Sequence, residues 1–150
     1  MKKLYAIAAA LCFGVAAFAQ NHSVTFQVDL GSTAASSNGV HVAGSFQSWS
    51  PSTTSMSQVG STSVYSVTVS VPAGQLEYKF INGNAWGDDE SVPAPIQVGT
   101  NGNNNRWAVI SQDTTLPAVM FAGAAPAGQK AIQFKVDYAL QTVSADSAHV

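Results

Sequence analysis

Charged residues and cysteine are both scarce in this chain of 150 residues. Only 9% of the residues are charged, with six Lys and Arg against eight Asp and Glu, so the formal net charge is −2. A nucleic-acid partner is excluded by this balance, because phosphate binding depends on clustered Lys and Arg. Hydrophobic residues make up 46% of the chain, which is too many for a disordered polar tail.

The single cysteine, Cys12, lies in an N-terminal segment with the features of a secretory signal peptide, residues 1–19. Two lysines after the first methionine precede an apolar run over residues 4–18, and Ala17 and Ala19 are the small residues of a cleavage site. The run is short for a membrane span. We therefore expect export to the periplasm, cell surface or medium, no membrane insertion after cleavage, and no disulfide in the mature chain.

Most of the remaining sequence alternates between apolar and polar residues with the period of β-strands. The Pro-Ala-Gly sequence at residues 72–74 predicts a turn that joins two of these strands as a hairpin. The features predict an all-β fold, a two-sheet antiparallel β-sandwich over residues 20–121. The predicted strands cover residues 24–30, 40–42, 65–71, 76–80, 107–109 and 116–121.

A small-residue segment and a repeat follow the predicted sandwich. Residues 122–130 are rich in Ala and Gly and predict a linker. Residues 24–42 and 132–150 align without a gap and share identities in both predicted strands. We expect residues 131–150 to begin a second, truncated copy in a fragment of a longer protein. The alternative is a terminal tail that pairs with the first domain.

Residues suited to catalysis or metal binding are few. No nucleophile motif lies near His41, which we interpret as a structural histidine on a sheet face. Asp88, Asp89 and Glu90 form the only carboxylate cluster, interpreted as a solvated acidic turn that positions Trp86; a calcium site is the alternative. Zinc-ligand spacing is absent. We therefore expect no catalytic residue, no metal and no cofactor.

Two of the three tryptophans, Trp49 and Trp86, follow strand ends in polar, Gly-rich surroundings, whereas Trp107 lies within an alternating strand and is expected in the core. An exposed indole can stack on the C–H face of a sugar ring, and asparagine amides both donate to and accept from hydroxyls. Lys79 has the opposite parity to the apolar residues of its strand, so it is expected on the outer face near Trp86. This pattern predicts a sugar-binding surface, with burial of both loop tryptophans as the alternative.

Two segments resemble the glycogen-binding domain of the AMP-activated protein kinase β subunit, a member of the early-set group of starch- and glycogen-binding modules. They are V-H-V-A-G-S-F-Q-S-W-S at residues 40–50 and L-E-Y-K-F-I-N-G-N-A-W at residues 76–86. The resemblance covers about residues 24–111 and implies an immunoglobulin-like sandwich that binds α-glucan without catalysis. The site residues that it implies are Trp49, Lys79, Trp86, Asn104 or Asn105, and Val98 at the place of a leucine.

Hypotheses from different functional classes follow. The first is a non-catalytic module of a secreted or surface protein that binds α-glucan, starch or glycogen. The alternative is a structural or adhesive β-sandwich repeat of a cell-surface protein, without a functional sugar site. A third hypothesis places an enzyme downstream of this chain, and these residues do not bear on it.

Overall fold

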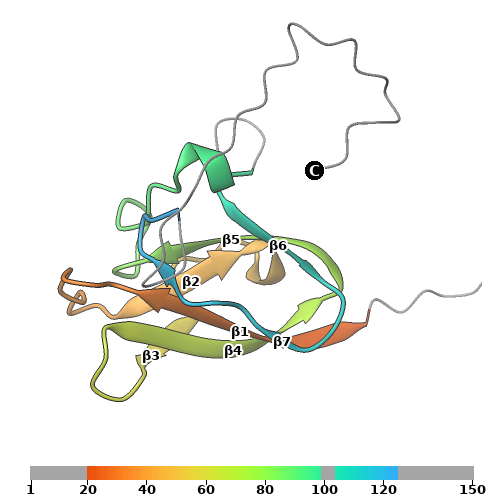
Figure 1. Ribbon diagram of the computed structural model, residues 1–150, viewed down its shortest axis with the longest axis horizontal. Helices are drawn as coiled ribbons and strands as arrows, with labels where there is room; N and C mark the ends of the chain where they lie inside the picture. Colours follow the sequence, from red (N-terminus) through yellow and green to blue (C-terminus); the bar gives the residue numbers. More distant parts are fainter. Residues whose placement is uncertain (1–19, 99–103, 125–150) are drawn as a thin grey trace, which may run out of the picture.

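The computed structural model describes residues 20–98 and 104–124, in which every regular element except two short 3₁₀ turns is a β-strand (Figure 1). The predicted all-β fold is confirmed. The predicted signal peptide and second copy lie outside the described residues. The strands are β1 (Asn21–Asp29), β2 (Val40–Gly44), β3 (Ser55–Gln58), β4 (Val64–Pro72), β5 (Gly74–Ile81), β6 (Arg106–Ile110), β7 (Thr114–Thr115) and β8 (Val119–Met120); the turns are η1 (Ser45–Gln47) and η2 (Ala94–Ile96).

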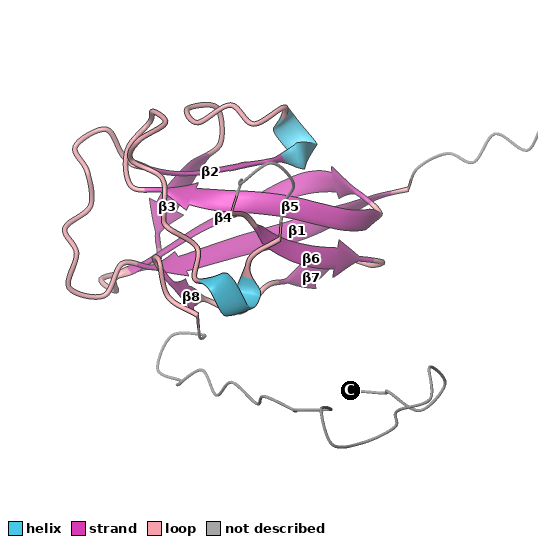
Figure 2. Cartoon of the chain, turned by 90° about the horizontal axis from the view of Figure 1, so that it is seen from above, coloured by secondary structure: helices cyan, strands magenta, loops and turns pink. Residues whose placement is uncertain are grey.

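The strands form two layers that face each other across one core (Figure 1), and in the view from above the two layers overlap (Figure 2). One layer has the order β6-β5-β2 and the other contains β4, β1 and β7, with β8 also paired to β1. Strand β3 pairs with β2 through Val40 and Met56 and with β4 through Ser57 and Ser66, so it joins the two layers into one curved sheet. Among the described residues, no helix is long and apolar enough to span a bilayer.

Alternation along β1 and β5 builds the core between the layers. Val24, Phe26 and Val28 are buried on one side, and Tyr78 of β5 meets the Phe26 ring edge-to-face with centroids 5.0 Å apart. Phe46 of η1 also stacks on the Phe26 ring, with centroids 5.5 Å apart. Burial raises the pKa of the Tyr78 hydroxyl to about 12, and the nearby Arg106 charge only partly opposes that rise.

Two details of the predicted topology are wrong. The strands on either side of residues 72–74 do not form a hairpin, because β4 pairs with β1 and β3 whereas β5 pairs with β2 and β6. The turn instead carries the chain from one layer to the other, with Gly74 at φ +117°. The sheet is also not purely antiparallel. Of the predicted strand at 116–121 only Val119–Met120 forms a strand, β8. The other short strand, β7, comes before Pro117 at Thr114–Thr115, and both run parallel to β1.

Candidate functional site

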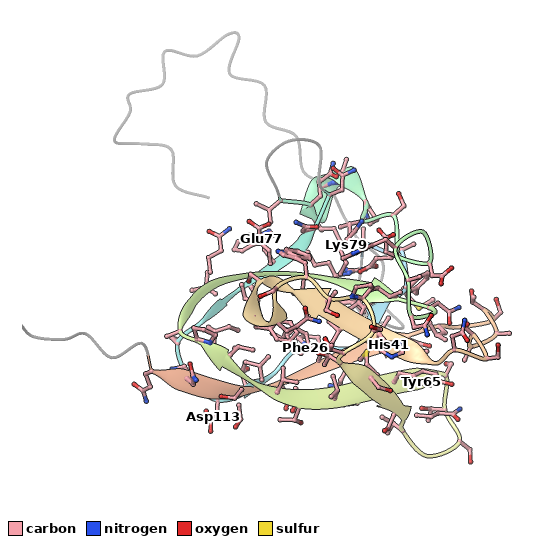
Figure 3. The ribbon with its side chains drawn as sticks, turned by 180° about the vertical axis from the view of Figure 1, so that it is seen from behind. Phe26, His41, Tyr65, Glu77, Lys79 and Asp113 are labelled. Atoms are coloured by element: carbon pink, nitrogen blue, oxygen red, sulfur yellow. The ribbon has the colours of Figure 1, made fainter. Side chains whose placement is uncertain are left out.

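The outer face of the β6-β5-β2 layer brings together three of the predicted site residues. Tyr78 of β5 pairs with Arg106 of β6, and the same antiparallel register places Asn105 beside Lys79. Val98 lies on the other side of Asn105, with backbone hydrogen bonds of 2.8 Å in both directions. Lys79, Asn105 and Val98 therefore form one row across the strands. Figure 3 shows Lys79 pointing away from the core residue Phe26.

Lys79 is held in an ion pair at this row. Its Nζ lies 2.5 Å from Oδ2 of Asp89, and its side chain is only 15% exposed. Burial acts to raise the pKa of Asp89, but the hydrogen bonds from Lys79 and from the Gly87 N–H outweigh it and lower this pKa. The lysine is thus fixed on the outer face, and an ammonium group has three donors, so it can also donate to a ligand hydroxyl.

Trp86 is presented on a braced loop after β5. The Asn82 N–H donates to the Asp88 carbonyl at 3.0 Å and closes the loop at its base. Nδ1 of His41 lies 2.6 Å from the Gly83 carbonyl, and this histidine is buried, as expected for a structural role. Trp86 is 49% exposed, which confirms the predicted exposure of this residue.

Trp49 follows η1, and the structure leaves it half-buried rather than fully exposed. Its N–H donates to the Gly44 carbonyl at 3.1 Å, and both Ser48 and Trp49 have φ 59°. A bulky residue is uncommon in this left-handed region, and such conformations are frequent at functional sites. The side-chain amide of Gln47 donates to the Ser50 carbonyl at 2.6 Å and braces the loop.

The two candidate asparagines differ in their surroundings. Asn105 is buried, and its Nδ2 donates to Oε2 of Glu77 at 2.9 Å. Asn104, directly before it, is exposed. The exposed Asn104 amide is therefore the one available to ligand hydroxyls, while Asn105 orients a neighbouring carboxylate.

Trp107 is not a core residue, contrary to the sequence-based expectation. It is 51% exposed on the outer face, where it is paired across the strands with Glu77, and Val109 on the same side is 67% exposed. Trp107 points outward because Arg106 and Ile110 take the inward positions of β6, so the odd-numbered residues between them lie on the outer face. An apolar tryptophan is expected to point inward in preference to a charged arginine. The opposite arrangement is explained only by the side chain that pairs with Arg106.

That partner is Glu90, so the interpretation of the acidic segment as a solvated turn is wrong at this residue. Both side chains are buried, and Nε and Nη2 of Arg106 each donate to the Glu90 carboxylate at 2.7 Å. Glu90 also accepts from the N–H groups of Phe80 and Ala122 at 3.0 Å. Nη2 of Arg106 donates to the Met120 and Gly123 carbonyls at 3.0 Å. We call this pair with its backbone partners the buried clasp.

The calcium alternative gains no support from the described part of the chain. Asp89 is paired with Lys79 and Glu90 with Arg106, so two of the three carboxylates are already neutralised by cations. Within residues 20–98 and 104–124, no three His, Cys, Asp or Glu side chains lie close enough together to hold a metal ion.

Comparison with models of known protein families gives a match. Residues 33–116, more than half of the chain, match the family described as the glycogen recognition site of AMP-activated protein kinase. The matched residues span the strands and loops that carry the outer-face row and both loop tryptophans. No curated protein matches the chain.

Proposed function

This chain belongs to the family of the glycogen recognition site of AMP-activated protein kinase, and from that premise we propose that it is the α-glucan-binding module of an exported protein. The family is one of non-catalytic carbohydrate-binding modules. The observation that carries the proposal is the exposed Trp86 on a braced loop. Its neighbour Gly87 donates to Asp89, the carboxylate that also fixes the ammonium group of Lys79. A flat apolar ring next to a fixed donor suits a sugar, which has an apolar C–H face and a rim of hydroxyls.

In the proposed complex, the glucan lies over the outer face of the β6-β5-β2 layer. Trp86 stacks on one sugar ring, and Trp49 contacts the curved chain from the η1 side. Lys79 and Asn104 hydrogen-bond to hydroxyls, and Val98 supplies a small apolar contact at the end of the row. Since the proposed contacts are few, the affinity is expected to be modest, with a Kd on the order of 10 µM to 1 mM.

Removing the exposed indole tests this proposal. We expect Trp86→Ala to weaken glycogen binding by about 1–3 kcal/mol, by analogy with the stacking of nucleobases on aromatic side chains. Affinity electrophoresis of the full chain in gels that contain glycogen or amylopectin measures this change, with Trp86→Phe as the matched variant that keeps an aromatic face.

Val59→Ala is the control at a distance, because Val59 is exposed but follows β3, away from the outer-face row. It should migrate like the parent chain in every gel, and a dextran gel controls for sieving. If the parent chain is not retarded by either α-glucan, the structural or adhesive repeat becomes the better explanation.

A further inference from the structure

We propose that Trp107 and Glu77 form a second sugar subsite on the outer face, which extends the site of the proposed function along β5 and β6. The inference rests on the proposed function but concerns residues outside the set that the family resemblance implies. Its ligand is the continuation of the same linear α-glucan chain, so the subsite favours longer chains over short ones.

The first argument is the placement of the Trp107 indole. It is 51% exposed on β6, which forms one end of the strand order, and the inward positions of this strand are filled by the buried Arg106 and Ile110. The indole therefore contributes little to the core. An exposed aromatic on an edge strand is a liability for aggregation, which favours a ligand as the reason for its presence.

The second argument is the carboxylate beside the indole. Glu77 is the cross-strand partner of Trp107, and such partners have Cβ atoms about 4.5–5.5 Å apart. Glu77 is half-buried, and Oε2 accepts a hydrogen bond from Asn105 at 2.9 Å, which fixes the orientation of the group. Among the described residues, no side chain or N–H donates to its other oxygen, Oε1. A sugar ring stacked on Trp107 would bring its hydroxyl rim to this acceptor.

The third argument is continuity with the first site. Asn105 directly precedes β6, and Trp107 is two residues further along the chain, which is a distance of about 7 Å in an extended backbone. A glucan that crosses the row of Lys79, Asn105 and Val98 can therefore extend onto Trp107 without leaving the outer face. In Figure 3, Glu77 and Lys79 both project from β5 on the side away from Phe26.

Chain-length dependence of binding tests the subsite. Isothermal titration calorimetry of the full chain with maltotriose and with linear malto-oligosaccharides of increasing length should show affinity rising with length. We expect Trp107→Ala to weaken binding of the long chains about five- to tenfold and to leave maltotriose binding unchanged. Glu77→Gln, which keeps an acceptor for Asn105 but removes the charge, should weaken only the long chains, by a smaller factor.

Val109→Ala is the matched control, since it removes an exposed apolar side chain from the same face of the same strand. It should bind every oligosaccharide like the parent chain. If Trp107→Ala binds long chains as tightly as the parent does, the second subsite is refuted. Equal losses for maltotriose and long chains would also refute it, because Trp107 would then belong to the first site.

Two further outcomes, no α-glucan binding by the parent chain and self-association through Trp107, can be told apart from those above. If the parent chain binds no α-glucan of any length, the proposed function fails and the subsite with it. If sedimentation shows that the parent self-associates, and Trp107→Ala abolishes association but not long-chain binding, the indole is an interface between copies and the subsite is overturned.

Discussion

At the residue scale, the chain uses its few charges in two different ways. Lys79 and Asp89 pair on the outer face, where water still reaches the carboxylate. Arg106 and Glu90 pair in the interior, with both side chains almost fully covered. Ion pairs near the surface contribute little to stability, whereas one partner of a buried pair cannot be removed without leaving an uncompensated charge. The outer pair therefore serves to orient Lys79, and the inner pair is essential to the fold.

The Lys79–Asp89 pair predicts a pH-dependent difference in stability. Because the pKa of Asp89 is lowered in the folded state, its contribution is present above the ordinary carboxyl range and is lost as pH falls through the lowered folded value. Asp89→Asn should lower the free energy of unfolding at neutral pH by about 1 kcal/mol or less. Thermal unfolding at several pH values should show the gap between the two proteins closing at acid pH.

Asp88→Asn controls for the general loss of a negative charge. Asp88 is adjacent and exposed, and it forms no ion pair among the described residues. A gap for Asp89→Asn that persists below the carboxyl range would contradict the assignment of the effect to the ion pair.

At the scale of elements, the segment from β2 into η1 places Trp49. Gly44 ends β2 directly opposite Tyr78 of β5, and a Cβ built on it would lie 2.6 Å from the Glu77 carbonyl oxygen and 2.8 Å from the Phe46 ring. The Gly44 carbonyl also accepts the N–H of Trp49. The glycine is thus required by close approach of the backbone of β5 rather than by its φ value.

Gly44→Ala should therefore move η1 away from β5. We expect a loss of about 1–3 kcal/mol in the free energy of unfolding, as for overpacked sites, together with weaker glycogen binding because Trp49 is displaced. Urea unfolding and affinity electrophoresis measure the two effects.

Gly60→Ala is the control that separates the loss of stability from the loss of glycogen affinity. Gly60 lies in the turn after β3 at φ +57°, with open space around it, so alanine strains a turn on another part of the molecule. It should lower stability without lowering affinity. Full glycogen affinity in Gly44→Ala would show that η1 does not control the site.

At the scale of the whole molecule, the buried clasp unites segments that are distant in the sequence. Glu90 ends the loop that carries Trp86, Arg106 begins the strand that carries Trp107, and both bind the backbone of residues 120–123. The two faces of these segments are therefore linked: the inward side chains form the clasp, and the outward ones form the candidate site. The packed part of the chain extends at least to Gly123, within the predicted linker.

Breaking the clasp should destabilise the entire domain. Glu90→Gln leaves the Arg106 guanidinium buried without a counter-charge, and we expect a loss of about 3–5 kcal/mol in the free energy of unfolding. Chemical denaturation monitored by tryptophan fluorescence measures this loss.

A double variant completes the test. Replacing both partners, as in Glu90→Leu with Arg106→Met, should lose clearly less than the sum of the two single variants, because no charge is left unpaired. Additive losses would show that the two residues act independently.

Much of the architecture could be predicted from local pattern. Alternation of apolar and polar residues indicated most of the strands, and the same parity placed Lys79 on the outer face. The prediction of a hairpin at residues 72–74 failed because turn residues specify a reversal of the chain, not whether the two strands stay in one sheet. β3 was missed, since Met56 is its only buried residue and leaves no alternation to detect.

The sequence by itself determined that this protein is built from strands, and its segments around Trp49, Lys79 and Trp86 were enough to indicate a resemblance to the glycogen-binding family. Those properties depend on residue type and short-range spacing. Only the tertiary structure decided that Arg106 points inward and Trp107 outward, that Glu90 is buried, and that Glu77 lies beside an exposed indole. Each of these depends on pairing between residues far apart in the chain, and the energy of a buried charge is set by its partner rather than by its own position.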